Sequence, residues 1–407
     1  MPLPSLFRNR NFLMLWLASI IGNFTLAVAM LAETWYVVKT LDAKEQLGYV
    51  MIAGSVPRIL LMAVGGVLAD RFKRGHIVMV SMGVRVLLLF ALIVLLHYGR
   101  LDIVALTIFA FLYGALDAFF WPAQGAIIPS IVPEAELTRA NSIMLTTNQI
   151  GLVFGPTIGT ALLALFSYES VFGMAGIGLL LGAACMLLLN EPPPVPRTTS
   201  DKPGSAMLHE LKEGLLYTLQ TPVLRSMMII YAFANLLFMG PLSIGIPLVV
   251  TQHLDGEVTT LGFLQSAGAA GMVAGGILLT LFPPKSKRLM MITLVIAAEG
   301  VLLALQGHTY WVWLAIGIQF LLGLGIVSNN VPMMSVIQQY SDRDKIGRVM
   351  SLNNMASMGL SPISYAMVTG LLALHVSIGW IMPIFGLAMS AAMLWCIFAM
   401  PVVRQSN

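Results

Sequence analysis

Charged side chains are scarce in this 407-residue sequence: Asp, Glu, Lys and Arg together make up 10% of it. Soluble domains carry about 25%. Hydrophobic residues make up 58%, and the mean hydropathy is +0.88. A water-soluble fold has too little interior to bury so many apolar side chains, so the composition places the chain in a lipid bilayer. The net charge of +4 is small and the sequence has no long basic run, so nucleic acid is not an expected partner.

Cysteines and catalytic motifs are also lacking. The two cysteines, Cys185 and Cys396, both lie inside apolar runs, which excludes a disulfide framework or a cysteine metal site as the organising feature. The six histidines are scattered, and the sequence contains neither HExxH nor GxSxG nor the GxxxxGK[ST] loop that binds ATP phosphates. We therefore expect no enzyme, no metal, no cofactor and no direct use of ATP.

Long apolar runs dominate the sequence instead. A helix needs roughly 20 apolar residues to cross the hydrocarbon core, and an open sheet would leave backbone groups unsatisfied in lipid. The first run is much longer than the roughly 7–15-residue core of a signal peptide, so we expect it to be a retained span. We predict an all-α integral membrane protein with twelve transmembrane helices at residues 11–38, 46–69, 76–98, 102–128, 141–166, 170–189, 224–250, 260–281, 288–305, 310–336, 349–374 and 377–400.

Lys and Arg are distributed unevenly between the loops that join these runs. With the N-terminus inside, 17 of the 22 Lys and Arg residues fall on the cytoplasmic side. The outer loops hold Lys39, Lys44 and Arg100, while Arg58 and Arg85 lie within spans. Because positively charged loops stay in the cytoplasm, this bias predicts that both termini are cytoplasmic.

A polar, proline-rich stretch divides the chain near its middle. The segment "NEPPPVPRTTSDKPGS" (190–205) is typical of a linker, and "AMLHELKEGLLYTLQTP" after it has the pattern of an amphipathic helix on the membrane surface. We therefore predict an N-terminal six-helix bundle at 1–190, a cytoplasmic linker with a surface helix at 191–221, and a C-terminal six-helix bundle at 222–407.

The two halves carry related motifs. Gly65-Gly66 and Gly275-Gly276 each precede a basic turn, and "PEAELTRANSIM" resembles "SDRDKIGRVMSL" at the matching place in the second half. Internal repeats are typical of transporters, whose cargo site lies near the midplane between two halves that rock around it. The repetition predicts two pseudo-symmetric bundles.

Two stretches carry a family resemblance. "GGVLADRFKRGH" (65–76) resembles a signature of the major facilitator superfamily, although Lys73 stands where the family usually has a second glycine and Thr280 replaces the acid in the second copy. "GLVFGPTIGT" (151–160) is similar to the antiporter motif of that family, with Ser142 and Thr160 in place of its outer glycines. The matching residues are Gly66, Asp70, Arg71 and Arg74 in the first motif and Gly151, Gly155, Pro156 and Gly159 in the second.

In its sequence motifs, the chain most resembles the branch of drug:proton antiporters that contains macrolide-efflux proteins and the enterobactin exporter. The resemblance implies the major facilitator fold and proton-coupled efflux of an amphipathic small molecule, such as a drug, a macrolide-like or a siderophore-like compound. It implies a multi-pass protein of the bacterial inner membrane that works as a monomer, with a small-molecule substrate, protons and the lipid bilayer as partners. A lipid or lysolipid flippase, or a small-molecule importer of the same fold, is the alternative.

Each motif has a functional interpretation and a purely structural one. Gly66, Asp70, Arg71 and Arg74 are expected to form a conformational latch at the cytoplasmic end of the second span, because a carboxylate there can accept from free helix N–H groups and face the cations. Alternatively Asp70 only caps a helix. The glycines at 151, 155 and 159 form one stripe, which is either a gate between the halves or ordinary close packing, and Pro156 invites a bend.

Ionisable residues inside spans are functional hypotheses by default. Arg85 and Asp117 lie at a similar depth of about 15 Å on neighbouring spans and are expected to pair; the alternative is a static structural bridge. Ala110 and Phe111 precede Gly114 where the drug antiporters of the family usually carry an arginine. Asp117 is therefore the first candidate for proton coupling.

Three further charges and several amides are candidates. Glu33 and Glu299 are additional proton-coupling candidates, although Glu33 could be a solvated helix end and Glu299 a buried neutral acid. Arg58 could attract cargo or pair with Glu33 or Asp117. The polar anchors expected in an otherwise apolar cavity are Asn23, Asn148, Gln149, Asn235, Gln265, Gln319, Asn329 and Asn330.

Overall fold

The computed structural model describes residues 5–192, 213–284, 286–342 and 346–405, apart from a number of side chains, Asp70 among them. The described part is helical and contains no strand, with twelve helices of 20 or more residues. Their bounds are α2 (Arg10–Trp35), α3 (Leu47–Arg71), α4 (Arg74–His97), α5 (Ile103–Ile131), α6 (Leu137–Leu165), α7 (Tyr168–Leu187), α9 (Pro222–Gln252), α10 (Val258–Leu281), α11 (Arg288–Gly307), α12 (Val312–Tyr340), α13 (Ile346–Ala373) and α14 (Ile378–Ala399).

These twelve helices confirm the predicted architecture, with ends that differ from the sequence-based runs by a few residues. Ten of them are long and apolar enough to cross a bilayer by length and composition. The other two are α3, which carries Arg58 near its midpoint, and α13, whose apolar part is Gly359–Ala373. The first span continues past α2 into the π-helical turn Tyr36–Thr40, so this run covers 31 residues, Arg10–Thr40.

Short elements complete the described part. The described part begins with α1 (Ser5–Arg8) and ends with α15 (Pro401–Gln405), and 3₁₀ turns at Lys44–Gln46 and Glu134–Glu136 precede α3 and α6. Residues 213–220 of the predicted surface helix are helical. The remainder of the predicted linker at 191–221 lies largely outside the described residues, so its path stays a prediction.

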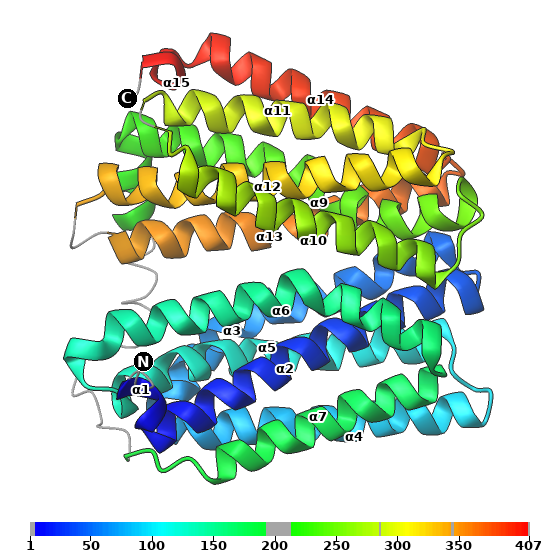
Figure 1. The fold of residues 1–407 in the computed structure, drawn as a ribbon, viewed down its shortest axis with the longest axis vertical. Coiled ribbons are helices and arrows are strands. Elements are labelled where there is room, and N and C mark those ends of the chain that lie inside the picture. Colours follow the sequence, from blue (N-terminus) through cyan, green and yellow to red (C-terminus); the bar gives the residue numbers. More distant parts are fainter. Residues whose placement is uncertain (1–4, 193–212, 285, 343–345, 406–407) are drawn as a thin grey trace. The chain divides into compact units, whose positions relative to one another are not determined.

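The chain divides into two compact units, Met1–Thr199 and Ser200–Asn407, and each is a bundle of six long helices (Figure 1). In the first bundle the extensive pairings are α3 with α5, α4 with α7, α2 with α6, α2 with α7 and α4 with α5. The second bundle repeats them as α10 with α12, α11 with α14, α9 with α13, α9 with α14 and α11 with α12. The two bundles are therefore pseudo-symmetric in their internal packing.

Glycines set the closest of these pairings. A methyl group at Gly114 of α5 would overlap the carbonyl oxygen of Gly54 in α3, and one at Gly323 of α12 would overlap that of Gly268 in α10. The backbones of the paired helices can touch here because no Cβ intervenes. In each bundle we call the end at which α2, α4 and α6, or α9, α11 and α13, begin the inner end, and the opposite end the outer end.

Candidate functional site

A group of three charges lies at mid-depth in the first bundle. Arg85 Nη2 of α4 is 2.6 Å from Asp117 Oδ1 of α5, and Arg58 Nη1 of α3 is 3.7 Å from Asp117 Oδ2. Arg85 is eleven residues into α4 and Asp117 is fourteen residues from either end of α5, which places both roughly 15–20 Å from the helix ends. The structure thus brings the expected pair of Arg85 and Asp117 together with Arg58, and it pairs Arg58 with Asp117 rather than Glu33.

Burial strengthens this charge group. Arg85 is 2% exposed and Asp117 is 3% exposed, whereas the side chain of Arg58 is 26% exposed. The Arg85 guanidinium also lies 4.6 Å from the ring centre of Tyr113 and 5.1 Å from that of Phe120, so two aromatic faces share its positive charge. With one carboxylate between two guanidinium groups, the group has a net positive charge, and Arg58 is its most exposed member.

Glu33 stands apart from this group. Its side chain is buried on α2, and Oε1 makes no hydrogen bond within the described part of the chain. It lies one turn before the π-helical segment Tyr36–Thr40. Single π-helical turns inside longer helices are frequent at functional sites. The solvated helix end that the sequence left open for Glu33 is wrong, because the residue is buried.

The second bundle has a different polar group at its core. Asn329 Nδ2 of α12 donates to Glu299 Oε1 of α11 at 2.9 Å. The Tyr231 hydroxyl of α9 donates to the carbonyl and side-chain oxygens of Asn329 at 3.1 and 3.2 Å, and Asn235 Nδ2 donates to the Tyr231 carbonyl oxygen at 2.9 Å. Three helices therefore meet around one carboxyl group through neutral partners.

Amides and hydroxyls line one side of α2. Asn23 Nδ2 donates to Asn148 Oδ1 at 2.7 Å, and Trp16 Nε1 donates to the Thr147 hydroxyl at 2.8 Å. The remaining candidate anchors are less uniform in their surroundings. Gln149 and Asn330 are exposed, Gln265 is half-buried, and Gln319 is buried. Sequence reasoning missed Ser19 and Gln124, which are buried and bonded to each other at 2.6 Å.

The described members of the first motif lie in different surroundings. A methyl group at Gly66 would meet no atom within 4 Å, whereas Gly65 is the member of the pair that contacts the backbone of Ala118 in α5. Arg71 is exposed, and the side chain of Asp70 lies outside the described residues, so its part in a latch stays a prediction. Arg74 Nε donates to the Ala69 carbonyl oxygen at 3.1 Å, which ties α4 to the end of α3.

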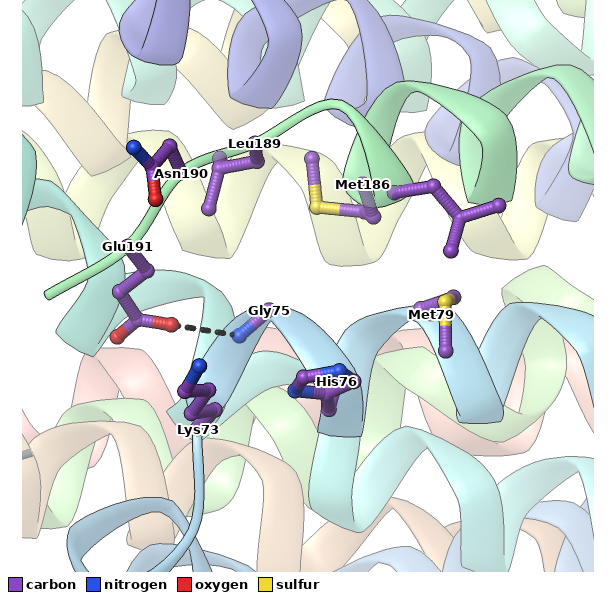
Figure 2. A pocket seen from close by; sticks show the side chains of 9 residues that line it. Lys73, Gly75, His76, Met79, Met186, Leu189, Asn190 and Glu191 are labelled. Atoms are coloured by element: carbon purple, nitrogen blue, oxygen red, sulfur yellow. Dashed lines mark hydrogen bonds between the residues drawn. The ribbon is translucent and has the colours of Figure 1, made fainter. Parts of the chain in front are cut away.

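Glu191 is the acid that the structure places beside Arg74. Glu191 Oε1 is 3.6 Å from Arg74 Nη1, and Glu191 Oε2 accepts from the Gly75 N–H at 2.9 Å in the first turn of α4. Figure 2 shows this carboxylate beside a cavity of about 130 Å³ at the inner end of α4 and α7. Just before it, Asn190 exchanges two hydrogen bonds with Asn11 of α2, at 2.9 and 3.0 Å.

The glycine stripe of the second motif faces α2 of the same bundle. A methyl group at Gly151 would lie 2.7 Å from Asn23 Cβ, and one at Gly159 would lie 2.8 Å from Leu31 Cδ2; one at Gly155 would overlap Ala27. The stripe therefore packs α6 against α2, as in the close-packing alternative. A gating role for this helix stays a prediction. No three His, Cys, Asp or Glu residues of the described part come together to form a metal site.

Comparisons with known proteins agree with this architecture. The model of a family described as the Major Facilitator Superfamily matches residues 15–365. Macrolide efflux protein A of Streptococcus pyogenes is 24% identical over 370 residues, which cover 89% of this chain and 88% of that protein. Macrolide efflux protein A of Enterococcus faecalis is 25% identical over 328 residues, or 79% of this chain and 97% of that protein. The crystal structure of a POT family transporter with 5-aminolevulinic acid matches with a TM-score of 0.74 at 12% identity, covering 98% of this chain and 97% of that one.

Proposed function

Because the chain belongs to the major facilitator superfamily, we propose that it exports an amphipathic small molecule by alternating access, in exchange for protons that enter the cell. The chain is a multi-pass membrane transporter, and efflux is the activity in the printed names of the macrolide relatives. The proposed cargo is a drug, a macrolide-like or a siderophore-like compound. The proposed location is the bacterial inner membrane with both termini in the cytoplasm, and the proposed functional unit is a monomer.

The buried charge group at Asp117 carries this proposal. Ions in the hydrocarbon region are expensive, so they persist mainly where a transport pathway or a proton relay needs them. Asp117 joins α3, α4 and α5 through its contacts with Arg58 and Arg85. Protonation of Asp117 would release both arginines and loosen this junction, which gives the proton a way to bias the conformational equilibrium.

In the first bundle, the proposed cargo contacts are Arg58 and the Asn23–Asn148 pair. Arg58 is the most exposed member of the charge group, and a cargo carbonyl or carboxylate could compete with Asp117 for its guanidinium group. The Asn23–Asn148 pair offers neutral donors and acceptors to the same cargo. An amphipathic compound needs such sparse polar anchors in an apolar site.

Uptake into proteoliposomes with and without an imposed pH gradient tests the proposed function. The panel contains a macrolide, a lipophilic cationic dye, a siderophore and a fluorescent lysolipid. Efflux predicts that one of the first three compounds accumulates inside the vesicles against its own concentration gradient when the lumen is acidic. This accumulation should collapse when the pH gradient is dissipated. Lipid movement without dependence on the gradient would favour the flippase, and co-movement of cargo with protons would favour the importer; either result overturns the proposal.

Matched cysteine positions test the orientation. Tyr98 and Tyr310 are exposed after α4 and α11 at the outer ends of their bundles, while Phe72 and Phe282 are exposed after α3 and α10 at the inner ends. Single cysteines at these four positions, in a chain without Cys185 and Cys396, can be labelled with an impermeant maleimide in intact cells. The proposed orientation predicts labelling at 98 and 310 alone, and labelling at 72 or 282 would reverse it.

A further inference from the structure

Glu299 is a buried acid with no cation facing it. It is 4% exposed, lies eleven residues into the 20-residue helix α11, and its Oε1 packs against Gly325 of α12. Three long helices pack on α11. Two of them, α12 and α14, contain no charged residue, and the third, α9, contains Arg225 in its first turn. The exposed Arg404 lies on the short α15.

The remaining neighbours are neutral or occupied. Arg288, the cation of α11 itself, donates to the Ser335 hydroxyl and to Gln339 at the inner end. The titratable side chain nearest in the hydrogen-bond network is Tyr231, which reaches Glu299 through Asn329. An ionised carboxylate in such a place costs several kcal/mol, because burial removes its hydration and no positive charge replaces it. The neutral carboxylic acid avoids that cost.

Glu299 and Gln306 form a line of two buried polar side chains along α11 toward its outer end. Gln306 lies seven residues further along α11, which is two turns on the same face and a distance of about 10 Å. It is 0% exposed, and neither amide atom bonds to the described protein. A wholly buried amide of this kind is usually satisfied by water, because leaving it unbonded costs about 1–3 kcal/mol.

His253 stands at the outer end of this line. It caps α9, its buried Nδ1 has no partner within the described residues, and its ring stacks on Tyr310 at 4.8 Å. A methyl group at Gly379 would lie 3.0 Å from the His253 ring and 3.5 Å from the carbonyl oxygen of Gly307, the residue after Gln306. His253 therefore covers the end of α11 at the point where Gln306 begins the polar line.

We propose that Glu299 is a proton-binding site of the second bundle and that water reaches it from the outer end past His253 and Gln306. A hydronium ion in this path gives its proton to the Glu299 carboxylate and leaves as water. Asn329 and Tyr231 hold the carboxyl group in place in both states. Proton binding here is independent of Asp117 and of any cargo; its coupling to transport alone rests on the proposed function.

Infrared difference spectroscopy tests proton binding without cargo or gradient. The purified full-length protein is compared at acidic and alkaline pH, and a protonated buried carboxyl group gives a C=O stretching band that shifts in D₂O. Glu299→Gln is expected to remove that band, while Glu33→Gln and Asp117→Asn leave it in place. An unchanged spectrum in Glu299→Gln overturns the proposal, whereas a protein that binds the proton but exports nothing would overturn the proposed function alone.

Two further measurements guard against variants that fold poorly. In the wild-type protein, a lipophilic carbodiimide reacts with protonated buried carboxyl groups, and peptide mass spectrometry should find label on Glu299 that declines as pH rises; no such label overturns the site. For the path, Gln306→Leu should slow the D₂O shift of the Glu299 band at least about tenfold. Gln319→Leu is the matched control, since Gln319 is buried but faces Gly268 of α10; equal slowing in both variants overturns the path.

Discussion

The two bundles carry a base and an acid, respectively, at one matched position. Arg85 and Glu299 each lie eleven residues after the arginine that begins their helix, Arg74 in α4 and Arg288 in α11. Arg85 meets a carboxylate at 2.6 Å and two aromatic rings, whereas Glu299 meets an amide. At this matched position the first bundle therefore holds an ion pair, and the second surrounds a single acid with neutral groups. An internal repeat can thus keep its helix packing while its polar core diverges.

The inner ends differ in the same way. Arg74 and Arg288 both donate Nε to a carbonyl oxygen of the preceding turn, at 3.1 Å in each case. The remaining guanidinium nitrogens then diverge, since Arg74 lies beside the carboxylate of Glu191 while Arg288 donates to Ser335 and Gln339. An ion pair in the first bundle is replaced by neutral hydrogen bonds in the second.

The largest expected effect separates the two acids. Asp117→Asn mimics a permanently protonated side chain, so we expect gradient-driven accumulation to fall to the level of empty vesicles while downhill exchange of cargo continues. Both activities are measured in the same vesicles, so the downhill rate also shows that the variant is folded. The double variant Asp117→Asn with Arg85→Gln is the matched control, because it avoids the roughly 3–5 kcal/mol cost of a buried charge without its partner.

Intact gradient-driven accumulation in Asp117→Asn would contradict the assignment of proton coupling to Asp117 of the first bundle. The paired acid of the first bundle would then be structural, and the unpaired acids Glu33 and Glu299 would be the remaining coupling candidates. Loss of downhill exchange in the double variant would instead show that the charge group is needed for cargo passage itself.

The repeated glycine contacts should respond equally in the two bundles. Gly114→Ala and Gly323→Ala each force a methyl group into a facing backbone, so each should destabilise the protein by about 1–3 kcal/mol or more. Gly83→Ala and Gly317→Ala are the controls, because a methyl group there meets nothing within 4 Å and alanine favours the helix. Thermal unfolding in detergent checks all four. Destabilisation in one bundle alone would show that the packing is not shared.

The inner-end ion pair should affect conformational switching more than binding. Glu191→Gln weakens a charged contact to Arg74, and Asp70→Asn removes the carboxylate of the predicted latch. Because charge-assisted hydrogen bonds contribute about 1.5–3 kcal/mol, we expect turnover to fall about tenfold with cargo affinity nearly unchanged. Ser335→Ala, at the neutral counterpart in the second bundle, should change turnover less. Equal loss of affinity and turnover would argue against a latch.

Sequence alone placed some of these features and missed others for a physical reason. Periodicity and apolar length predicted the helices, and helical rise predicted that Arg85 and Asp117 would meet, since depth along a span is a local property. The Glu191 contact with Gly75 joins residues 116 positions apart. Its position in a polar, proline-rich stretch indicated a solvated linker, and only the packing of α7 beside α4 brings it to Arg74.

The sequence also did not show how each helix is rotated about its own axis, which determines the neighbours that its side chains face. The sequence marked Glu299, Asn329 and Asn235 as separate candidates because spacing gives depth but not the partner that a side chain faces. For the same reason, the sequence could not say whether the glycine stripe of α6 is a gate or a packing surface. The structure shows that the stripe contacts Asn23 and Leu31 of α2. Short-range patterns therefore predicted the fold and the meeting of Arg85 with Asp117, whereas the other side-chain contacts required the structure.

The smallest expected effect concerns histidines at the outer ends. Burial lowers the pKa of His253 below its ordinary value of 6.5, and the neighbouring His308 lowers it further, against a hydrogen bond that the imidazole donates to the Gly307 carbonyl oxygen, which raises it. The folded protein then binds this proton less readily than the unfolded chain, so stability falls as pH drops below about 6.5. His97 of the first bundle differs, since its Nδ1 lies 3.5 Å from a Glu169 carboxylate oxygen.

His253→Gln should therefore reduce the loss of melting temperature between pH 7.5 and pH 5.5, by a small amount because one partly buried group is involved. The unfolding midpoint in detergent, followed at several pH values, measures that slope. His97→Gln is the matched control, because His97 is an exposed histidine at the outer end of the first bundle, and this variant should leave the slope unchanged. A shallower slope in His97→Gln than in His253→Gln would mean that acid sensitivity resides at the outer end of the first bundle.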